Sequence, residues 1–374
     1  MKVAFLVDGS LDQISGGYVY DRRLVDHLRS QGDQVEVLSL PAGSYLRRWR
    51  TNFDARLLSR LVDMDADIVL EDELSHPGLL RLNSSLRRQW SAPIVTIVHH
   101  LRSSEPAAWP LPAVYASVER AYLRSVDGFV FNSRATRRAV ENLMGDAAPA
   151  IVAPPAGDRL RPSLTDEAIQ RRTHETGPLR LLFVGNLIRR KGLLTLLDAL
   201  AALPASLVKL TVVGDAAFEP AHAAAVRRRI DRGRLGDRVE LLGPLYDDRL
   251  ASRMADSHVL VVPSLYEGFG IVYLEAMGFG LPAIGGTAGG AAEIIREGEN
   301  GFLVQPGDSH TLTERLRLLA QDRSRLEVMS LAAHRTYRAQ PTWARTGDVI
   351  RQFLVESLRR PVIHSFPMAK EESI

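Results

Sequence analysis

The sequence has no cysteine, no long apolar run and almost no net charge. The absence of cysteine excludes disulfide bonds, thiolate nucleophiles and cysteine-ligated metals. No run of roughly 18 apolar residues could span a bilayer, and the apolar run at residues 2–7 meets Asp8 too early to serve as an export signal. A formal charge of +3 does not indicate a nucleic-acid partner. We therefore expect a cytoplasmic protein that could touch the inner face of a membrane only peripherally.

What the sequence does contain is a regular alternation of apolar runs of strand length with helical patterns, such as those at residues 18–29 and 114–124. The apolar runs are residues 2–7, 34–40, 67–71, 93–99, 128–132 and 150–154 in the first half, and 179–185, 208–214, 238–243, 258–263 and 281–286 in the second. This alternation predicts parallel sheets covered on both faces, and 374 residues exceed what one core usually fills. We expect an α/β protein with two Rossmann-like, doubly wound domains, divided in the polar stretch 157–178.

The most informative segment is SLYEGFGIVYLEA, residues 264–276, which follows an apolar run and predicts a strand, a tight loop and a helix. Gly268 and Gly270 flank Phe269 in the loop, so the backbone there can approach a ligand closely, and the free N–H groups of the helix start favour an anion. We expect a nucleoside diphosphate at this position.

Two carboxylates, Glu267 and Glu275, stand in the same segment. Ionised carboxylates accept hydrogen bonds from the vicinal hydroxyls of ribose and hexoses. Two alternatives remain open: an acid and base pair of the kind found in glycoside hydrolases, or a turn contact for Glu267 and a helix-surface ion pair for Glu275.

Residues that follow other strands are the next candidates, because ligands of doubly wound sheets bind beyond the carboxyl ends of the strands. Gly16 and Gly17 precede a helix and could offer N–H groups to phosphate, or merely form a turn. His99 could bind a sugar hydroxyl, move a proton or be structural. If the chain is still extended there, His100 points to the opposite face, so at most one of the two should face the ligand. No third ligand is spaced to complete a metal site with them.

A basic triplet, Arg189 to Lys191, lies between the strand-ending Gly185 and a predicted helix. Cations at a helix start oppose the helix dipole, so a bound phosphate would relieve the conflict, with Lys191 and Arg190 as the stronger candidates. The turns at residues 213–215 and 243–246 could line a nucleobase pocket or be ordinary turns. Glu293 is expected to cap or pair structurally.

Together these segments resemble a known family. The block HVLVVPSLYEGFGIVYLEAMGFGLPAIGGTAGGAAEIIREGENGFLV, residues 258–304, resembles the C-terminal signature of the family 4 retaining glycosyltransferases, which have the GT-B fold. Weaker matches are GGYVYDRRLVDHLRSQGDQVEV, IVHHL, FNSRAT and FVGNLIRRKGL. The resemblance implies transfer of a sugar from a nucleotide-diphosphate donor to an acceptor hydroxyl, with retention of configuration and without a metal or other cofactor. The acceptor would be a glycan, a lipid-linked molecule or a small molecule.

The resemblance also implies roles for individual residues. Glu267 would hold the donor sugar and Glu275 the ribose diol. Arg190 and Lys191 would neutralise the diphosphate, aided by N–H groups of Phe269, Gly270 and the Gly16 to Gly17 loop. His99 would contact the donor sugar near the reacting carbon. Asn186 stands where many members have arginine, and residues 155–158 replace the family's usual junction sequence, which puts some phosphate and nucleotide contacts in doubt.

The resemblance further implies an acceptor-binding domain at residues 1–160, completed by a crossover helix at 342–360, and a nucleotide-sugar-binding domain at 178–340. Residues 44–62 are rich in arginine and read as one basic amphipathic helix, on a membrane surface or simply packed on the first domain. Sequence after Pro361 shows no periodicity. Other functions left open are a nucleotide-sugar epimerase or sugar phosphorylase of the same fold, and a non-catalytic sugar-nucleotide-binding subunit.

Overall fold

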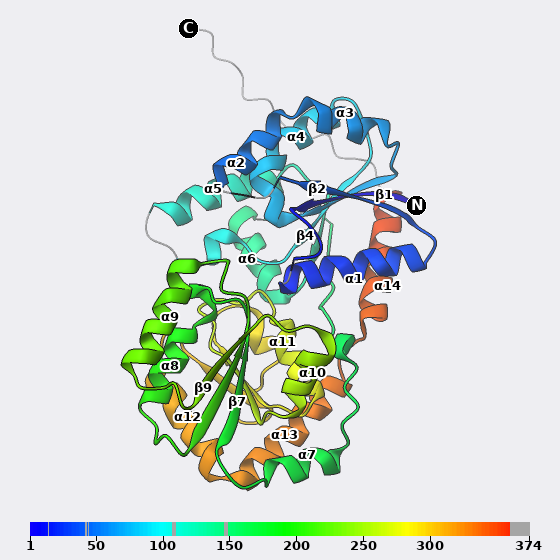
Figure 1. Cartoon of the computed structure of the whole chain (residues 1–374). Helices are drawn as coiled ribbons and strands as arrows, with labels where there is room; N and C mark the ends of the chain where they lie inside the picture. The colour runs from blue at the N-terminus through cyan, green and yellow to red at the C-terminus, as the bar shows by residue number, and fades with distance from the viewer. Residues whose placement is uncertain (14, 42, 44, 107–109, 146–148, 360–374) are drawn as a thin grey trace.

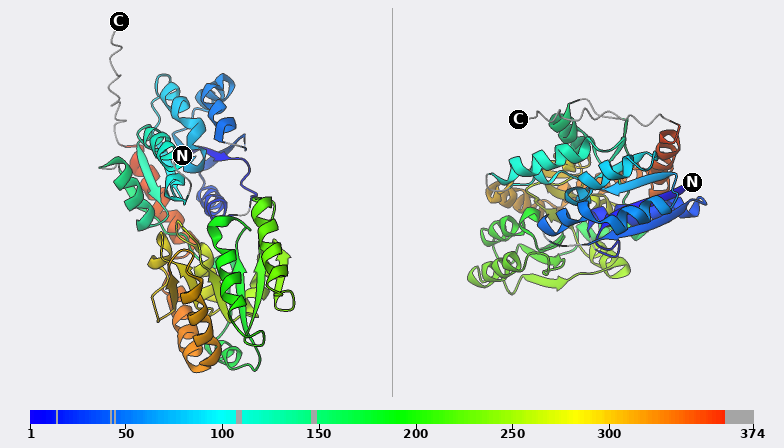
Figure 2. Two further views of the ribbon diagram at one scale, coloured as in Figure 1. Left: turned by 90° about the vertical axis from the view of Figure 1, so that its left-hand side faces the viewer. Right: turned by 90° about the horizontal axis from the view of Figure 1, so that it is seen from above.

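A computed structural model describes residues 1–13, 15–41, 43, 45–106, 110–145 and 149–359, so the tail after Pro361 lies outside the described residues. The chain forms two six-stranded parallel sheets in two lobes, one above the other in Figure 1. Figure 2 shows the same two lobes from the side and from above. The predicted α/β architecture with two doubly wound sheets is confirmed.

The first sheet has the strand order β2-β1-β3-β4-β5-β6. Its strands are β1 (Lys2–Asp8), β2 (Gln34–Leu40), β3 (Ile68–Asp72), β4 (Ile94–Val98), β5 (Gly128–Phe131) and β6 (Ala150–Val152). Its helices are α1 (Gly16–Ser30), α2 (Tyr45–Trp49), α3 (Ala55–Asp63), α4 (His76–Arg87), α5 (Leu111–Leu123) and α6 (Arg134–Met144), with 3₁₀ turns η1 (Arg50–Phe53), η2 (Glu73–Ser75) and η3 (Arg102–Ser104). Side chains of β1 alternate between two core clusters: Val3 and Phe5 enter one, and Ala4 and Leu6 the other. Burial on both faces explains why these strands are nearly continuous apolar runs.

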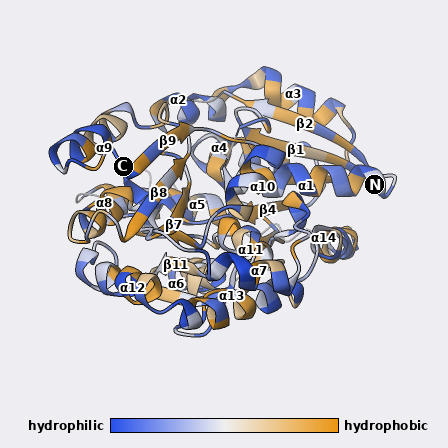
Figure 3. Ribbon diagram, turned by 60° about the horizontal axis from the view of Figure 1, so that its bottom comes forward, coloured by the Kyte–Doolittle hydropathy of each residue, from blue (hydrophilic) through white to orange (hydrophobic). Residues whose placement is uncertain are grey.

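The second sheet has the order β12-β11-β10-β7-β8-β9. Its strands are β7 (Leu179–Val184), β8 (Val208–Val213), β9 (Val239–Gly243), β10 (Val259–Val262), β11 (Ala283–Gly286) and β12 (Gly301–Val304). Its helices are α7 (Asp166–Thr173), α8 (Leu193–Ala201), α9 (Pro220–Arg232), α10 (Asp247–Ala255), α11 (Ile271–Gly278), α12 (Ser309–Gln321) and α13 (Arg323–Arg338), with 3₁₀ turns η4 (Asp158–Leu160), η5 (Arg189–Lys191) and η6 (Gly290–Glu293). The helices carry both hydrophobic and hydrophilic residues, as helices that cover a sheet with one face do (Figure 3). The sequence did not predict β12, a strand of four residues with a single pairing partner, β11.

The strand order of each sheet reverses direction once, between β1 and β3 in the first and between β7 and β10 in the second. Such a reversal opens a crevice at the carboxyl ends of the strands, because the flanking connections run to opposite sides. The segments predicted to bind ligand follow these strands or their neighbours.

The last helix, α14 (Trp343–Ser357), returns to the first lobe and packs against α1. Its Ile350, Phe353 and Leu354 are buried in the same cluster as Val3 and Phe5 of β1. We propose on this basis that the two domains are residues 1–160 with 342–360, and residues 178–340.

The prediction of one basic helix at residues 44–62 is wrong. The structure breaks this stretch into α2, η1 and α3, because Asp54 caps α3 by accepting hydrogen bonds from the backbone N–H groups of Arg56 and Leu57. Leu57 packs on the core of the first lobe, whereas Phe53 is 62% exposed. Within the described residues, we find no helix with the length and apolar character needed to cross a membrane.

Candidate active site

A cleft of about 1000 Å³ lies between the two lobes and is lined by the loops that follow β1, β3, β4, β7, β8, β9 and β10. Every residue predicted for the site lines this one cleft: Gly16, Gly17, His99, Gly185, Asn186, Arg190, Lys191, Glu267, Gly268, Phe269, Gly270 and Glu275. Arg189 is exposed and is not among the lining residues. Folding thus gathers segments from both halves of the chain around one cleft.

Glu267 is the centre of a charged cluster on the second lobe. Its carboxylate lies 2.6 Å from Nζ of Lys191 and 3.7 Å from Nη1 of Arg190, and it accepts a hydrogen bond of 3.0 Å from the Ser264 hydroxyl. Burial raises the pKa of Glu267, but the charges of Lys191 and Arg190 outweigh it and lower the pKa to about 2. Glu267 is therefore ionised at neutral pH, which excludes it as a general acid.

The basic turn η5 is held against this cluster by its own geometry. Gly192 ends the turn with φ of +72°, and any Cβ at this position would collide with the backbone of Pro263. Arg190 also donates to the carbonyl of Tyr266 at 2.9 Å and lies 3.2 Å from the Glu105 carboxylate of the first lobe. The guanidinium of Arg190 thereby bridges the two lobes.

Glu275 is 4% exposed and pairs with Arg159, whose Nε lies 2.7 Å from Oε1. The ion pair predicted as an alternative for Glu275 therefore exists, but it is buried and its partner comes from the junction between the lobes. Arg159 also lines the cleft. The junction can lie close to α11 because residue 157 is glycine: a Cβ there would meet the backbone of Leu274 in α11 at 2.8 Å.

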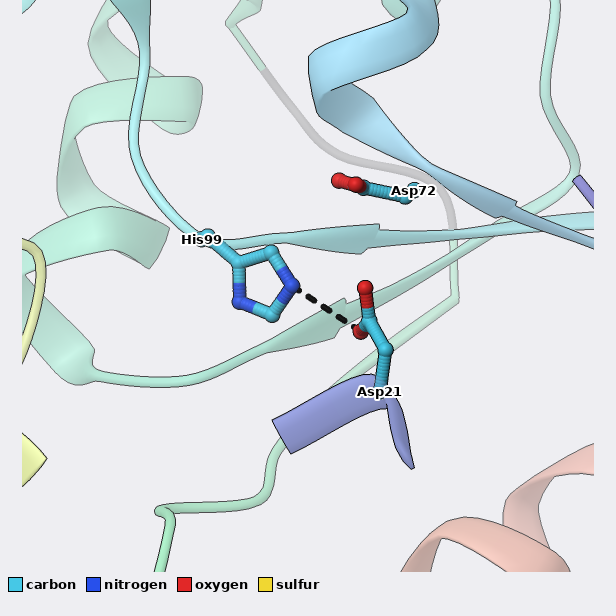
Figure 4. Close-up of side chains that lie close together, drawn as sticks. All are labelled: Asp21, Asp72 and His99. Atoms are coloured by element: carbon cyan, nitrogen blue, oxygen red, sulfur yellow. Dashed lines mark hydrogen bonds and ion pairs between the residues drawn. The ribbon is translucent and has the colours of Figure 1, made fainter. Parts of the chain in front are cut away.

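His99 is buried, and its side chain forms a hydrogen bond with a helix of its own lobe. Its Nε2 lies 3.0 Å from Oδ1 of Asp21, with Asp72 beside them, as Figure 4 shows. Burial lowers the pKa of His99, but the nearby carboxylates of Asp21, Asp72 and Glu73 outweigh it and raise the pKa to about 9. His99 is therefore an imidazolium at neutral pH, with one N–H committed to Asp21.

The structure adds two observations about the histidines. His99 and His100 both line the cleft, although at most one of the two was expected to face the ligand. The strand ends at Val98, so the strict alternation of an extended chain does not apply beyond it. The spacing of the sequence offered no third group near His99, yet folding places Asp21 and Asp72 within 4.8 Å of its ring nitrogen and of each other.

The two lobes touch directly beside the site. The Ser133 hydroxyl donates to the Gly268 carbonyl at 2.8 Å, and a Cβ on Gly268 would collide with the carbonyl oxygen of His99. Glu293 accepts hydrogen bonds from the N–H groups of Arg134 and Ala135 at the start of α6, which confirms its predicted structural capping role. The structure is therefore a closed arrangement in which the His99 and Glu267 loops are in contact.

The turns after β8 and β9 complete the second-lobe wall of the cleft. Gly214 abuts the backbone of Gly185, where a side chain would not fit, and Asn186 accepts a hydrogen bond of 3.4 Å from the N–H of Asp215. Asn186 thus links the turn after β7 to the turn after β8. Leu245 and Tyr246 add apolar surface to the same wall.

Sequence reasoning missed three residues of the cleft region, Asp21, Arg159 and Glu73. Asp21 lies four residues after Gly17 in α1, so helical spacing could have placed both on one face. Glu73 comes just beyond the carboxyl end of β3, where the strand-end rule would have selected it. Nothing in the sequence marks Arg159 as the partner of Glu275.

Two sequence-family models match the chain, "Glycosyltransferase Family 4" over residues 14–159 and "Glycosyl transferases group 1" over residues 165–336. The chain belongs to glycosyltransferase family 4. This glycosyltransferase is 28% identical over 277 residues to D-inositol 3-phosphate glycosyltransferase of Geodermatophilus obscurus, a match that covers 70% of this chain and 61% of the relative.

Solved structures of similar fold span nearly the whole glycosyltransferase. Sucrose-phosphate synthase from Thermosynechococcus elongatus has a TM-score of 0.79 at 23% identity, covering 95% of this chain and 98% of the other. HepE from Anabaena in complex with UDP-glucose has a TM-score of 0.78 at 22% identity, covering 95% of this chain and all of the other (100%). These likenesses show the GT-B fold, as expected from the sequence.

Proposed function

We propose that this glycosyltransferase moves a hexosyl group from a nucleoside diphosphate sugar to an acceptor hydroxyl, with retention of configuration and without a metal. The observation that carries the proposal is the cluster of Glu267, Lys191 and Arg190 at the glycine-rich loop of the cleft. It offers two cations for a diphosphate and one ionised carboxylate for sugar hydroxyls. The relative's name as a glycosyltransferase and the UDP-glucose complex of HepE support the same substrate class.

In this proposal the cations act on the leaving group. Lys191 is partly buried beside Glu267, with its side chain 15% exposed, and this burial lowers its pKa. A diphosphate entering the cleft would gain charge-assisted hydrogen bonds from Lys191 and Arg190. As the bond to the sugar breaks, negative charge grows on the phosphate, and fixed cations stabilise that charge without reorganisation. N–H groups of Phe269, Gly270 and the Gly16 to Gly17 loop would complete the phosphate site.

The carboxylates position the donor. Glu267 would accept hydrogen bonds from the hydroxyls of the sugar, and Glu275 from the ribose diol, with Gly185 and Asn186 lining the path between them. Glu275 reaches the donor while Arg159 holds its other side, so the carboxylate is fixed before binding. His99, charged and anchored by Asp21, would face the sugar near the reacting carbon. Catalysis then comes from positioning and electrostatics.

A donor screen tests the proposal. UDP, GDP, ADP and their common sugar derivatives are added to the purified chain, and the melting temperature identifies the nucleotide that binds the native state. Nucleotide release that requires an acceptor supports transfer, whereas epimerisation of the donor, phosphate-dependent cleavage or binding without turnover would contradict it. The anomeric configuration of the product, read by NMR, tests retention. Unchanged rates with a chelator test independence from metal.

A further inference from the structure

The first-lobe side of the cleft contains a pocket floor that the donor does not explain. The pairing of β1 with β3 ends at Leu6, which lies opposite Glu71. Asp8 and Glu73 each come two residues after this pair, so they lie on neighbouring segments of the chain. Both line the cleft at the crevice where the strand order of the first sheet reverses. Two carboxyl groups therefore lie at the floor of this lobe.

Glu73 is buried there without a partner. It is 1% exposed, and neither carboxyl oxygen has a hydrogen-bond partner among the residues that the structure describes. His76 Nδ1 lies 3.3 Å from Oε1, but it also lies 3.0 Å from the carbonyl oxygen of Glu73, and burial lowers the pKa of His76 to about 4. The neutral ring supplies no positive charge. Burial raises the pKa of Glu73 to about 8, although the positive charges of His99, Arg48 and Arg102 lower it in part.

Asp8 adds a second free acceptor. Its Oδ2 pairs with Arg48, but its Oδ1 is buried with no hydrogen-bond partner in the described part of the chain. A buried polar group left without a partner costs roughly 1–3 kcal/mol. Buried polar groups without a partner are rare in native proteins, so orphaned oxygens beside a ligand cleft point to a ligand that carries hydrogen-bond donors.

The surroundings indicate the kind of ligand. The rings of Tyr45 and Tyr115 lie with centroids 5.2 Å apart on the wall of the cleft, which offers an apolar face with hydroxyl tips. The two arginines nearest Glu73 each contact a carboxylate: Arg48 pairs with Asp8, and Arg102 pairs with Glu105 at 3.5 Å and lies over the face of Tyr115. Among the described residues around Glu73, the carboxyl groups of Asp8, Glu73 and Glu105 therefore outnumber the guanidinium groups of Arg48 and Arg102, which disfavours an anion there.

We propose that Glu73 binds a hydroxyl of the acceptor and thereby selects acceptors that present an uncharged sugar or polyol, rather than a phosphate, at the floor of the first lobe. This inference rests on the proposed transferase function. A hydroxyl both donates and accepts, so it can bond to the carboxyl group in either protonation state. A phosphate would meet two carboxyl groups and would be repelled by the ionised forms.

The test compares Glu73→Gln with Glu71→Gln as a matched control. Glu71 is a fully buried carboxyl two residues earlier, with its pKa raised to about 7, but it accepts hydrogen bonds from Asn83 and Tyr122 and does not line the cleft. The donor found in the thermal screen is supplied with glucose, mannose and myo-inositol, and with glucose 6-phosphate, mannose 6-phosphate and inositol 3-phosphate. Initial rates give KM and kcat for each acceptor, and calorimetry gives the Kd of the nucleotide.

We expect the unphosphorylated acceptors to have at least tenfold higher kcat/KM than their phosphorylated counterparts. Glu73→Gln should raise the acceptor KM at least tenfold and leave the nucleotide Kd within twofold. Glu71→Gln should leave the acceptor KM within twofold, whatever its melting temperature.

Three results would overturn the inference while leaving donor binding intact: an unchanged acceptor KM in Glu73→Gln, a preference for the phosphorylated acceptors, or turnover of the donor by water alone with every acceptor rejected. The comparison of acceptors uses the unaltered protein, so it stands even if a variant fails to fold. Absence of any nucleotide binding would instead refute the proposed function, and the inference with it.

Discussion

The contact between the His99 and Glu267 loops makes Gly268 a position at which the closed arrangement can be tested. A methyl group at Gly268 would collide with the carbonyl oxygen of His99 and lie 3.3 Å from Cβ of His100. The obstacle is backbone, so it cannot rotate away, and relief requires the loops to separate by roughly 1 Å. A misplacement of about 1 Å in a site built on positioning costs roughly 100-fold in rate, equivalent to about 2.7 kcal/mol.

Gly268→Ala should therefore lower kcat/KM roughly 100-fold, measured from initial rates with saturating donor and varied acceptor. The nucleotide Kd should change less than threefold, because Lys191 and Glu275 belong to the second lobe. Gly236→Ala is the control, since a Cβ at Gly236 meets nothing within 4 Å. If Gly268→Ala keeps kcat/KM within threefold of the unaltered protein, the loop contact is not part of the working geometry.

Three further substitutions probe the charges of the cleft. Glu275→Ala should weaken nucleotide binding more than tenfold in calorimetry, because buried ribose hydroxyls lose a charged acceptor; unchanged affinity would remove Glu275 from the site. Lys191→Ala should reduce turnover by more than its loss of stability explains, and a wild-type rate would refute the assignment of Lys191 to the phosphate site. The same variant should weaken the stabilisation that ionised Glu267 contributes to the folded state, which is present above pH 4.5 and lost as the pH falls toward 2. Asp21→Asn should lower the pKa of His99 in an NMR titration, and it should cost more stability at pH 6 than at pH 9.5. The reason is that the stabilisation from the raised pKa of His99 is present below pH 6.5 and lost as the pH rises through about 9. Equal losses of stability at both pH values would argue against the ion pair.

The strands were predictable because burial on both faces leaves a nearly continuous apolar run, as in β1 and β4. The strand β12 was not predicted, because four residues at the edge of a sheet are too few to show a strand periodicity. The prediction of a single helix at residues 44–62 was wrong because it relied on the helical spacing of arginine and leucine. It gave too little weight to one capping residue, Asp54.

The site was predictable where it depends on local geometry, and not where it depends on contacts between distant segments. Glu267 and Lys191 each follow a strand, so the strand-end rule selected both without showing that they form an ion pair. The partners Asp21 of His99 and Arg159 of Glu275 lie 78 and 116 residues away along the chain. The packing of the two lobes determines which side chains meet over such separations. A local sequence pattern contains no information about that packing.

The return of α14 to the first lobe has a consequence for synthesis on the ribosome. The first sheet cannot complete its core until residues 343–357 have been made, since Ile350, Phe353 and Leu354 cover β1. The second sheet, by contrast, holds all of its strands between Leu179 and Val304 and is made in full before α14 appears. Domains generally mature in the order of translation. Here we expect the later half of the nascent chain to reach its native packing first, with the earlier half protected from aggregation only once the final helix docks.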